Sequence, residues 1–309
     1  MSLSFKTLVE RDLILRTIRQ FFYERGFVEV QCPLLAGEIA PEANIKPFMV
    51  CRSPSQFQGY LITSPELFMK RLLCTGAADI FHISPVFRQE EYSDIHLPEF
   101  TLLEWYRIGA DYYDLMSDCE ELLLTCCSVA ASESAGPCVE FKGHKVLLDR
   151  PFKRLTVREA FRRYAGWEPG PCPDEYKFDL DMVTRVEPAL SEEGAVFLYD
   201  WPASMASLSR LKADEPDVAE RVELYVAGLE LANGFSELAD PAEQRRRFEE
   251  EIEKIRKSDD RLCKMPVRFL DDMKDMPESV AGMALGVDRL IMLLLGKERI
   301  SDVVCFPNG

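Results

Sequence analysis

The chain has 309 residues, 47% hydrophobic and 29% charged, which suits a soluble globular protein of one large domain or two smaller ones. A formal charge of −16 argues against a non-specific polyanion binder, because phosphate contacts need clustered Lys and Arg, although a local basic patch is not excluded. Ten cysteines occur without a Cys-x-x-Cys pair, the three histidines are scattered, and no secretory signal or bilayer-length apolar run is present, so we expect a cytoplasmic protein with reduced thiols and neither a zinc site nor a disulfide framework.

The N-terminal segment predicts a long helix followed by a short strand. Apolar residues recur at three-to-four spacing over residues 5–25, and Gly26 suits the end of that helix. Residues 27–33 then read as a strand that Pro33 stops. This unit can form a dimer interface or an ordinary helix-to-strand connection, and the sequence alone slightly favours the second interpretation. Residues 34–57 are rich in proline and predict loops.

Residues 61–66 predict a strand that runs into a helix over residues 67–75. Ser64 is a candidate N-cap, with Pro65 at the first helical position. Glu66 lies in the first turn, where the helix dipole favours a carboxylate. Glu66 can also receive an ammonium group from a ligand, and the two roles are compatible.

The most informative stretch, residues 81–107, predicts two strands, 81–88 and 99–107, joined by a charged loop. Alternation in the second strand separates two faces, one with Phe100, Leu102, Glu104 and Tyr106 and the other with Thr101, Leu103 and Trp105. A carboxylate between an aromatic residue and a tyrosine is costly to bury unless it is paired, so the first face is a candidate ligand surface. Arg88 beside Phe100 can hold a phosphate and a purine ring. The alternative is a surface hairpin with ordinary cross-strand ion pairs.

The middle of the chain carries no recognisable motif. A helix is predicted over residues 114–131, a small hairpin over 132–151, and a short helix with a Thr cap over 156–164. Residues 166–193 mix prolines and charges, and we interpret them as a variable insert that covers the site. A strand over residues 195–199 and a turn follow.

Residues 219–238 predict a hairpin around a two-residue Ala227–Gly228 turn. That turn places Glu223 diagonally from Glu230 on one face, with no basic partner expected between them. Two such carboxylates suit a hard divalent cation, and Mg²⁺ with a nucleotide is the usual one. The alternative is a solvated strand face.

Glu237 lies seven residues after Glu230, so strict alternation places it on the opposite face of the strand. A bulge at Asn233–Gly234 would return Glu237 to the face of Glu230. With that bulge, Glu223, Glu230, Asn233 and Glu237 converge on one site.

The C-terminal part begins with a charged helix over residues 240–257, whose Arg245–Arg247 run we interpret as a solvated face. A later strand carries small residues at Gly282, Ala284 and Gly286, where a ligand can lie against the backbone. Asp288 and Arg289 follow at the start of an apolar helix. Arg289 at this N-terminus is a candidate polyphosphate ligand.

Three of these segments resemble the signature motifs of class II aminoacyl-tRNA synthetases, namely Gly26 to Pro33, Phe87 to Phe100, and Gly286 to Arg289. The lysine-specific branch is indicated by Ser64-Pro65-Glu66 and by the segments 98–106 and 230–238. The resemblance implies an α+β fold, in which helices flank a central antiparallel sheet.

Two departures indicate a particular branch of that family. The first predicted helix begins within ten residues of the start, which leaves no room for the N-terminal anticodon-binding barrel of lysyl-tRNA synthetases. Ala284 stands where those enzymes usually have glycine. Both features resemble the short paralogous family of elongation factor P–(R)-β-lysine ligases. A further departure is Leu97, which replaces the family asparagine near the nucleotide and affects one ATP contact.

This resemblance implies a single catalytic domain over residues 1–309, with a variable insert at about 132–195 and no anticodon-binding domain. It implies a homodimer that uses ATP and Mg²⁺ to activate (R)-β-lysine or lysine and then transfers it to a lysine of elongation factor P. Neither tRNA nor a membrane is expected as a partner.

The resemblance also assigns site residues. Arg88 and Arg289 are the implied catalytic residues, and Glu223 and Glu230 the metal ligands. The implied substrate-binding residues are Ser64, Pro65, Glu66, Glu104, Tyr106, Asn233, Glu237 and Ala284. The implied ATP-binding residues are Arg88, Gln89, Glu90, His96, Phe100, Glu230, Leu231, Gly286 and Arg289. Two rival interpretations are a truncated lysyl-tRNA synthetase that still charges tRNA and a catalytically silent binding module.

Overall fold

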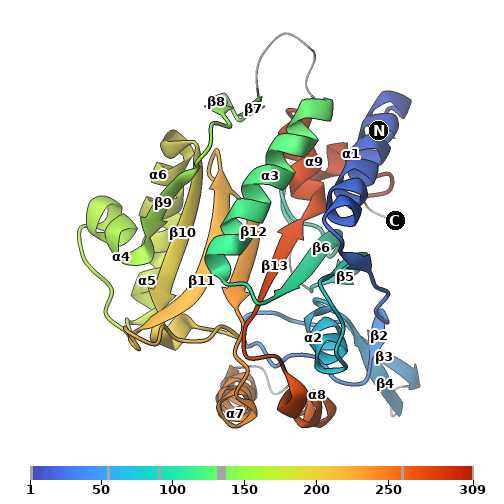
Figure 1. The fold of residues 1–309 in the computed structure, drawn as a ribbon, viewed down its shortest axis with the longest axis vertical. Coiled ribbons are helices and arrows are strands. Elements are labelled where there is room, and N and C mark those ends of the chain that lie inside the picture. Colours follow the sequence, from blue (N-terminus) through green and yellow to red (C-terminus); the bar gives the residue numbers. More distant parts are fainter. Residues whose placement is uncertain (1–2, 54–55, 90–91, 131–136, 259–260, 308–309) are drawn as a thin grey trace.

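A computed structural model describes residues 3–53, 56–89, 92–130, 137–258 and 261–307. Its largest feature is an eight-stranded sheet in the order β1-β5-β6-β13-β12-β11-β10-β9, flanked by helices (Figure 1). Neighbours from β5 to β10 pair antiparallel, whereas β1 and β9 pair parallel at the two edges. The predicted α+β class is therefore confirmed, with parallel strands added at its edges.

The strands of this sheet are β1 (Val28–Glu29), β5 (Ile80–Phe87), β6 (Glu99–Ile108), β9 (Lys153–Thr156), β10 (Ala195–Pro202), β11 (Val218–Val226), β12 (Leu229–Ser236) and β13 (Val280–Gly286). A small sheet holds β2 (Leu35–Ala36), β3 (Met49–Ser53) and β4 (Gln56–Leu61), and a separate hairpin holds β7 (Cys138–Phe141) and β8 (His144–Leu147). The helices are α1 (Phe5–Glu24), α2 (Glu66–Cys74), α3 (Tyr112–Ala130), α4 (Val157–Ala160), α5 (Glu175–Asp181), α6 (Glu187–Leu190), α7 (Pro241–Ser258), α8 (Val267–Asp272) and α9 (Val287–Leu294).

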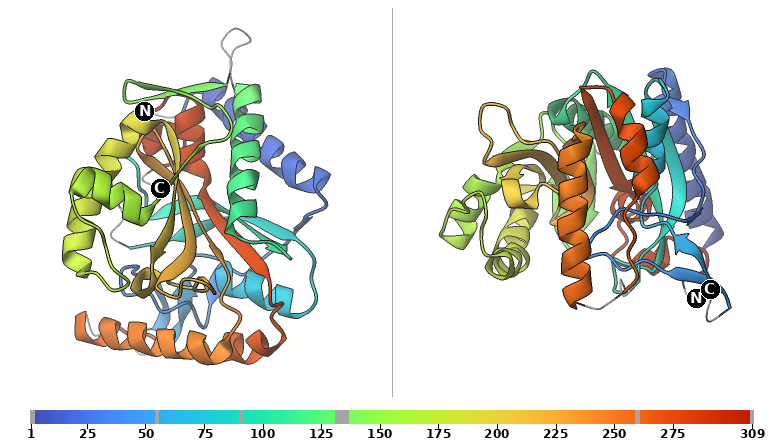
Figure 2. Two further views of the ribbon diagram at one scale, coloured as in Figure 1. Left: turned by 60° about the vertical axis from the view of Figure 1, so that its left-hand side comes forward. Right: turned by 90° about the horizontal axis from the view of Figure 1, so that it is seen from below.

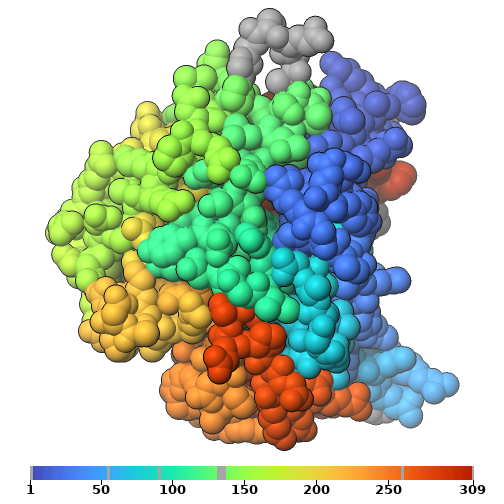
Figure 3. Space-filling model, in the orientation of Figure 1, coloured from blue at the N-terminus to red at the C-terminus, as the bar shows by residue number. Residues whose placement is uncertain are grey.

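One face of the sheet is buried beneath helices. Helices α3 and α9 pack on the strands and α1 packs on α3, so that side chains of α1 and α3 cover this face in Figure 3. Leu103 and Trp105 point into this core, and the Trp105 indole donates to Asp118 of α3 at 3.2 Å. The predicted alternation of β6 is confirmed, because Phe100, Leu102 and Glu104 face the other way, into a cavity.

The opposite face is partly enclosed by the insert and by the C-terminal helices. Helix α8 packs against α2 and α7. Helices α7 and α8 lie at the lower end of the strands in Figure 1 and in the left view of Figure 2. The insert has its own apolar core, in which Phe161 and Phe178 stack with ring centroids 4.4 Å apart beneath Trp201. The middle of the sheet borders a cavity that lies between the insert and α7.

Several predicted boundaries in the N-terminal third are wrong. The strand expected over residues 27–33 is limited to Val28–Glu29, and the region expected as loops contains β2, β3 and the start of β4. These strands pair mainly with each other, so they lack the alternating burial that marks a strand on a core. The end of α1 is confirmed, because Gly26 has a φ of +81°.

The start of α2 also differs from the prediction. The preceding strand ends at Leu61, and the helix begins at Glu66 with Pro65 at the cap position. The Ser64 hydroxyl still accepts the Glu66 backbone N–H at 2.9 Å, so Ser64 acts as a cap from one residue further out.

The β11–β12 hairpin turns at Ala227–Gly228 as predicted, and both residues have positive φ. Tyr225 pairs with Glu230, whereas Leu224 pairs with Ala232. The extra residue is therefore Leu231, and the bulge expected at Asn233–Gly234 is wrongly placed. A bulge at Leu231 puts Glu230 and Asn233 on the same face although they are three residues apart.

Candidate active site

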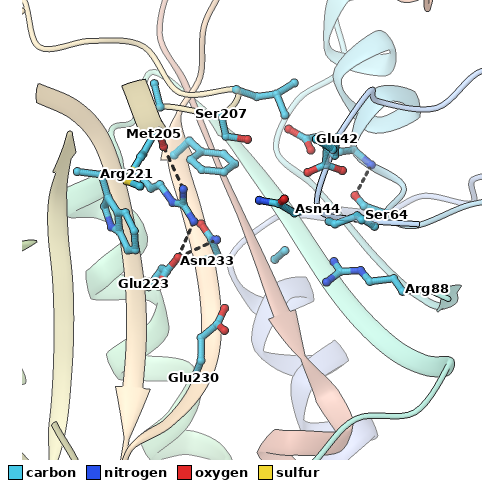
Figure 4. A pocket seen from close by; sticks show the side chains of 18 of the residues that line it. Glu42, Asn44, Ser64, Arg88, Met205, Ser207, Arg221, Glu223, Glu230 and Asn233 are labelled. Carbon is cyan, nitrogen blue, oxygen red and sulfur yellow. Dashed lines mark hydrogen bonds and ion pairs between the residues drawn. The ribbon is translucent and has the colours of Figure 1, made fainter. Parts of the chain in front are cut away.

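The open face of the sheet carries a cavity of about 800 Å³, within the usual range for small-ligand sites. Figure 4 shows residues from the loops on one side facing residues from β11 and β12 on the other. Most of the sequence-predicted site residues line this cavity, namely Ser64, Glu66, Arg88, His96, Phe100, Glu104, Glu223, Glu230, Leu231, Asn233, Ala284, Gly286 and Arg289.

The other predicted site residues lie elsewhere. Pro65, Gln89, Tyr106 and Glu237 do not border the cavity, and Glu90 lies outside the described residues. Gln89 is held by its backbone N–H, which donates to the Lys46 carbonyl at 2.7 Å.

Strand register assembles the floor of the cavity from residues far apart in sequence. Glu104 of β6 pairs with Ala284 of β13, Ala284 pairs with Asn233 of β12, and Asn233 pairs with Glu223 of β11. One row across four strands thus connects the expected amine-binding carboxylate to the expected metal ligand. Ala284 lies between these polar residues in the row and borders the cavity, so its methyl group takes up space that a glycine would leave open.

The acidic residues at one end of the cavity are joined by a lysine that the sequence reasoning missed. Lys70 of α2 is 2% exposed, and its ammonium lies 2.5 Å from Glu66 Oε1 and 2.5 Å from Glu237 Oε2. Glu104 accepts from the Ser64 hydroxyl at 2.5 Å and from the Tyr106 hydroxyl at 3.3 Å. We call Glu66, Lys70, Glu104 and Glu237 the amine pocket.

Charge in the amine pocket is unbalanced, since three carboxylates share one ammonium. Burial, reinforced by Glu66, raises the pKa of Glu104 to about 8. Burial likewise raises the pKa of Glu237 to about 8, although Lys70 opposes this shift. Glu237 and Glu66 hold the pKa of Lys70 above its ordinary value despite its burial. The pocket is therefore suited to a ligand that brings two positive charges.

Glu237 lies behind the cavity wall, where Gly282 makes room for it. A Cβ on Gly282 would overlap the Tyr106 ring and the Glu237 carboxylate. Glu237 Oε1 is buried without a hydrogen-bond partner among the described residues. Its contact with the cavity therefore runs through Lys70 and Glu66.

The other end of the cavity is lined by cationic and aromatic side chains. The Arg88 guanidinium lies 5.3 Å from the centroid of the Phe100 ring. Arg289, in the first turn of α9, donates to the Glu230 carbonyl at 2.9 Å and lies 2.5 Å from His96 Nε2. Two guanidinium groups and an aromatic face are chemically suited to a nucleotide.

The two expected metal ligands share a face, as predicted, but the expectation that they have no basic partner is wrong. Arg221 lies 2.6 Å from Glu223 Oε1, and Arg289 lies 3.7 Å from Glu230 Oε2. Asn233 also donates to Glu223, at 3.1 Å. Burial and Glu230 still raise the pKa of Glu223 to about 7 although Arg221 opposes this. The two carboxylates thus each face a guanidinium group, and they can still offer oxygen ligands to a cation whose other ligands are phosphates.

Two ion-paired residues of the site, Arg221 and Lys70, could have been found from their spacing in the sequence. Arg221 is two residues before Glu223, so strand alternation was a usable signal for that ion pair. Lys70 lies four residues after Glu66 among buried residues of α2, which was also a signal. Leu97 is buried in the helix-side core and borders the cavity with an apolar side chain in place of an amide.

The arginine run of α7 is only partly the solvated face expected. Arg246 and Arg247 border the cavity, and Arg247 donates to the Ser209 carbonyl at 2.7 Å. The insert contributes as expected, with Phe178 and Met182 among the lining residues. No described helix has the length and apolar character needed to span a membrane.

The chain is similar in sequence to proteins of a known family. The family model for class II tRNA synthetases of the D, K and N type matches residues 4–309. Elongation factor P–(R)-β-lysine ligase from Salmonella arizonae is 37% identical over 313 residues, covering 99% of this chain and 96% of that protein. The protein of the same name from Proteus mirabilis is 37% identical over 335 residues, covering 99% of this chain and 96% of that protein. The one from Yersinia enterocolitica is 36% identical over 308 residues, covering 98% of this chain and 95% of that protein.

Proposed function

The chain belongs to the class II tRNA synthetase family of the D, K and N type, and we propose from this membership the reaction that it catalyses. It is an ATP-dependent ligase that activates (R)-β-lysine or lysine as an aminoacyl-adenylate and joins it to a lysine side chain of elongation factor P. Relatives that share more than a third of its residues over nearly the whole chain are named elongation factor P–(R)-β-lysine ligase.

The observation that carries this proposal is the continuity of the cavity. The acidic amine pocket and the guanidinium-lined nucleotide end belong to one cavity of about 800 Å³. The Glu104–Ala284–Asn233–Glu223 row links them. A diamino acid and a nucleotide can thus meet with their reacting ends between the two sites, which is the positioning that adenylate formation needs.

In the first step, Glu66 and Glu104 receive one ammonium of the amino acid. Asn233 lies beside the second ammonium, while Glu237 holds Lys70, and through it Glu66, from behind the cavity wall. Arg88 holds the α-phosphate and the substrate carboxylate, and the purine stacks between Phe100 and Arg289. The carboxylate oxygen attacks the α-phosphorus as pyrophosphate leaves, and positioning and charge stabilisation supply the catalysis.

We assign Mg²⁺ to Glu223 and Glu230. Their carboxylates are hard oxygen ligands on one face, and a site with one or two carboxylates is usual when phosphates complete the coordination. The cation neutralises charge on the phosphates when it is bound. Arg221 keeps Glu223 oriented toward the cavity.

We also propose a homodimer in which α1 forms part of the interface. Phe5, Val9 and Leu13 recur every four residues along α1 and are 80%, 52% and 44% exposed. An apolar stripe of this kind is typical of an association surface. We further propose a cytoplasmic location, which the ten free cysteines support because free thiols suit a reducing compartment.

The test is an ATP-dependent mass increase of purified elongation factor P, measured with α-lysine and (R)-β-lysine side by side. Pyrophosphate exchange with each isomer reports the first step separately. Labelled amino acid on tRNA instead of elongation factor P would select a tRNA-charging enzyme. Absence of exchange with both isomers would indicate a silent binding module.

A further inference from the structure

Glu42 is a carboxylate in the cavity wall that neither the sequence nor the nucleotide and amine contacts explain. It lies on the segment 41–45, all of which borders the cavity. In Figure 4 it neighbours Ser64, lies on the same side as Arg88, and faces the wall that carries Arg221 and Glu223. It therefore lies near both Glu66 of the amine pocket and Arg88, the residue expected to hold the α-phosphate.

The backbone around Glu42 is firmly held. Arg261 donates to the carbonyls of Glu42, Ala43 and Ile45 at 2.6, 3.0 and 2.7 Å. The Glu251 carboxylate accepts the Ala43 backbone N–H at 2.9 Å. These contacts fix the backbone of the segment and do not involve the Glu42 carboxylate.

The Glu42 carboxylate differs from the carboxylates of the amine pocket and from Glu223 in its lack of a close partner. Glu66 is paired with Lys70, Glu104 with Ser64, and Glu223 with Arg221. Within the described part of the chain, the Glu42 carboxylate makes no hydrogen bond or ion pair, and it interacts with its surroundings only through longer-range charges. An oxygen with free lone pairs can accept a proton from an incoming group.

The second step of the reaction needs such an acceptor. A lysine side chain ordinarily arrives as an ammonium, which is not a nucleophile. We propose that Glu42 is the general base of the transfer step and removes a proton from the acceptor lysine. This assignment rests on the proposed function.

The chemical step balances as follows. The Glu42 carboxylate takes one proton from the acceptor ammonium, and the freed lone pair attacks the carbonyl carbon of the adenylate. A C–N bond forms while the bond between that carbon and the phosphate oxygen breaks, and AMP leaves with the electron pair. The second proton on nitrogen passes to solvent as the amide forms.

The electrostatic surroundings of Glu42 suit this role. The charged groups that face it are Glu66 from α2, Arg88 after β5, Arg221 from β11 and Glu251 from α7. Burial, then Glu66, raises its pKa to about 7, and Arg88 opposes that rise. A base with a pKa near the working pH combines ionisation with proton affinity.

The experiment separates the two half-reactions in the intact protein. Enzyme-bound adenylate is formed, isolated and mixed with elongation factor P, and its transfer rate is compared with the rate of pyrophosphate exchange. In Glu42→Gln we expect transfer to fall about 100-fold or more, the usual contribution of a general base, while exchange falls at most severalfold. The transfer rate of the wild type should rise with pH through about 7, and Glu42→Gln should lose that limb.

Two variants serve as matched comparisons. Glu38→Gln removes a carboxylate that precedes the segment 41–45 and does not border this cavity, and it should leave both rates near those of the wild type. Glu42→Asp keeps the base and should recover part of the transfer rate with its pH limb. A parallel fall in exchange with a raised KM for the amino acid would make Glu42 an amine ligand and overturn the proposal, as would unchanged transfer. Wild-type protein without exchange would refute the proposed function instead.

Discussion

Replacing Lys70 tests whether the amine pocket is organised by the protein's own cation. Lys70→Met removes two ion pairs of 2.5 Å and leaves Glu66 and the fully buried Glu237 facing each other. Breaking a buried ion pair by removing one partner typically costs about 3–5 kcal/mol, so we expect a loss of that order in the free energy of unfolding at pH 8. The KM for the diamino acid in pyrophosphate exchange should rise, because Glu66 loses its support.

The loss should depend on pH in a defined direction. The pKa of Glu237 is already raised to about 8 and rises further without Lys70, so the folded variant binds more protons than the unfolded chain. Stability of the variant relative to the wild type therefore falls as pH rises above about 8, where the wild-type carboxyl ionises and that of the variant stays protonated, by up to about 1.4 kcal/mol per pH unit for each such carboxyl. Urea unfolding at several pH values measures this.

Lys70→Arg is the matched control, because it keeps the charge and one or both ion pairs. It should lie closer to the wild type than Lys70→Met in both stability and KM. A Lys70→Met protein that loses less than about 1 kcal/mol, shows no pH trend and keeps its KM would refute the reasoning, since a buried carboxylate pair must respond to losing its cation.

Three further changes test other parts of the cavity. The KM for the diamino acid should fall as pH rises from 6 to 8, because Glu104, with its pKa raised to about 8, must ionise to receive an ammonium; exchange assays on the wild type and Glu104→Gln measure this, and equal slopes would contradict it. Gly282→Ala places a methyl group against Tyr106, so thermal unfolding should show a loss of about 1–3 kcal/mol together with a raised KM for the amino acid, and an unchanged KM would argue against a tight pocket wall. Arg11→Met removes the guanidinium that lies 2.6 Å from the buried Asp288 carboxylate, and Asp288 is next to Arg289 in sequence. The KM for ATP should therefore rise more than the KM for the amino acid. A larger rise in the KM for the amino acid would refute the role of Asp288 in positioning Arg289.

The elements that carry the site were readable from local patterns. The alternation of β6 separated Trp105 from Glu104, the Ala227–Gly228 turn set the hairpin, and Gly26 marked the end of α1. In β6 the apolar face packs against helices and the mixed face meets the cavity, so the period of the sequence reports the environment. At the turn and at Gly26 the backbone has positive φ, which the residue types themselves indicate. The family motifs lie on these elements, which is why the family was identified correctly.

The ion pairs required the tertiary structure. Arg221 beside Glu223 and Lys70 beside Glu66 follow from spacing within one element, yet the second contact of Lys70, to Glu237, joins residues that no local pattern connects. The position of the bulge at Leu231 depends on how β12 pairs with both of its neighbours. Glu42 lies in an irregular segment with no periodic signal at all.

The sequence by itself determined the α+β class, the family and most of the residues on the cavity wall, because helical and strand periods and short motifs are properties of neighbouring residues. Only the tertiary structure decided which carboxylates of the site are paired, which lie behind the cavity wall, and that Glu42 makes no close contact with the described residues. Those outcomes depend on burial and on charges brought together from α2, β11 and the segment 41–45, and electrostatic energy follows distance in space and not distance along the chain.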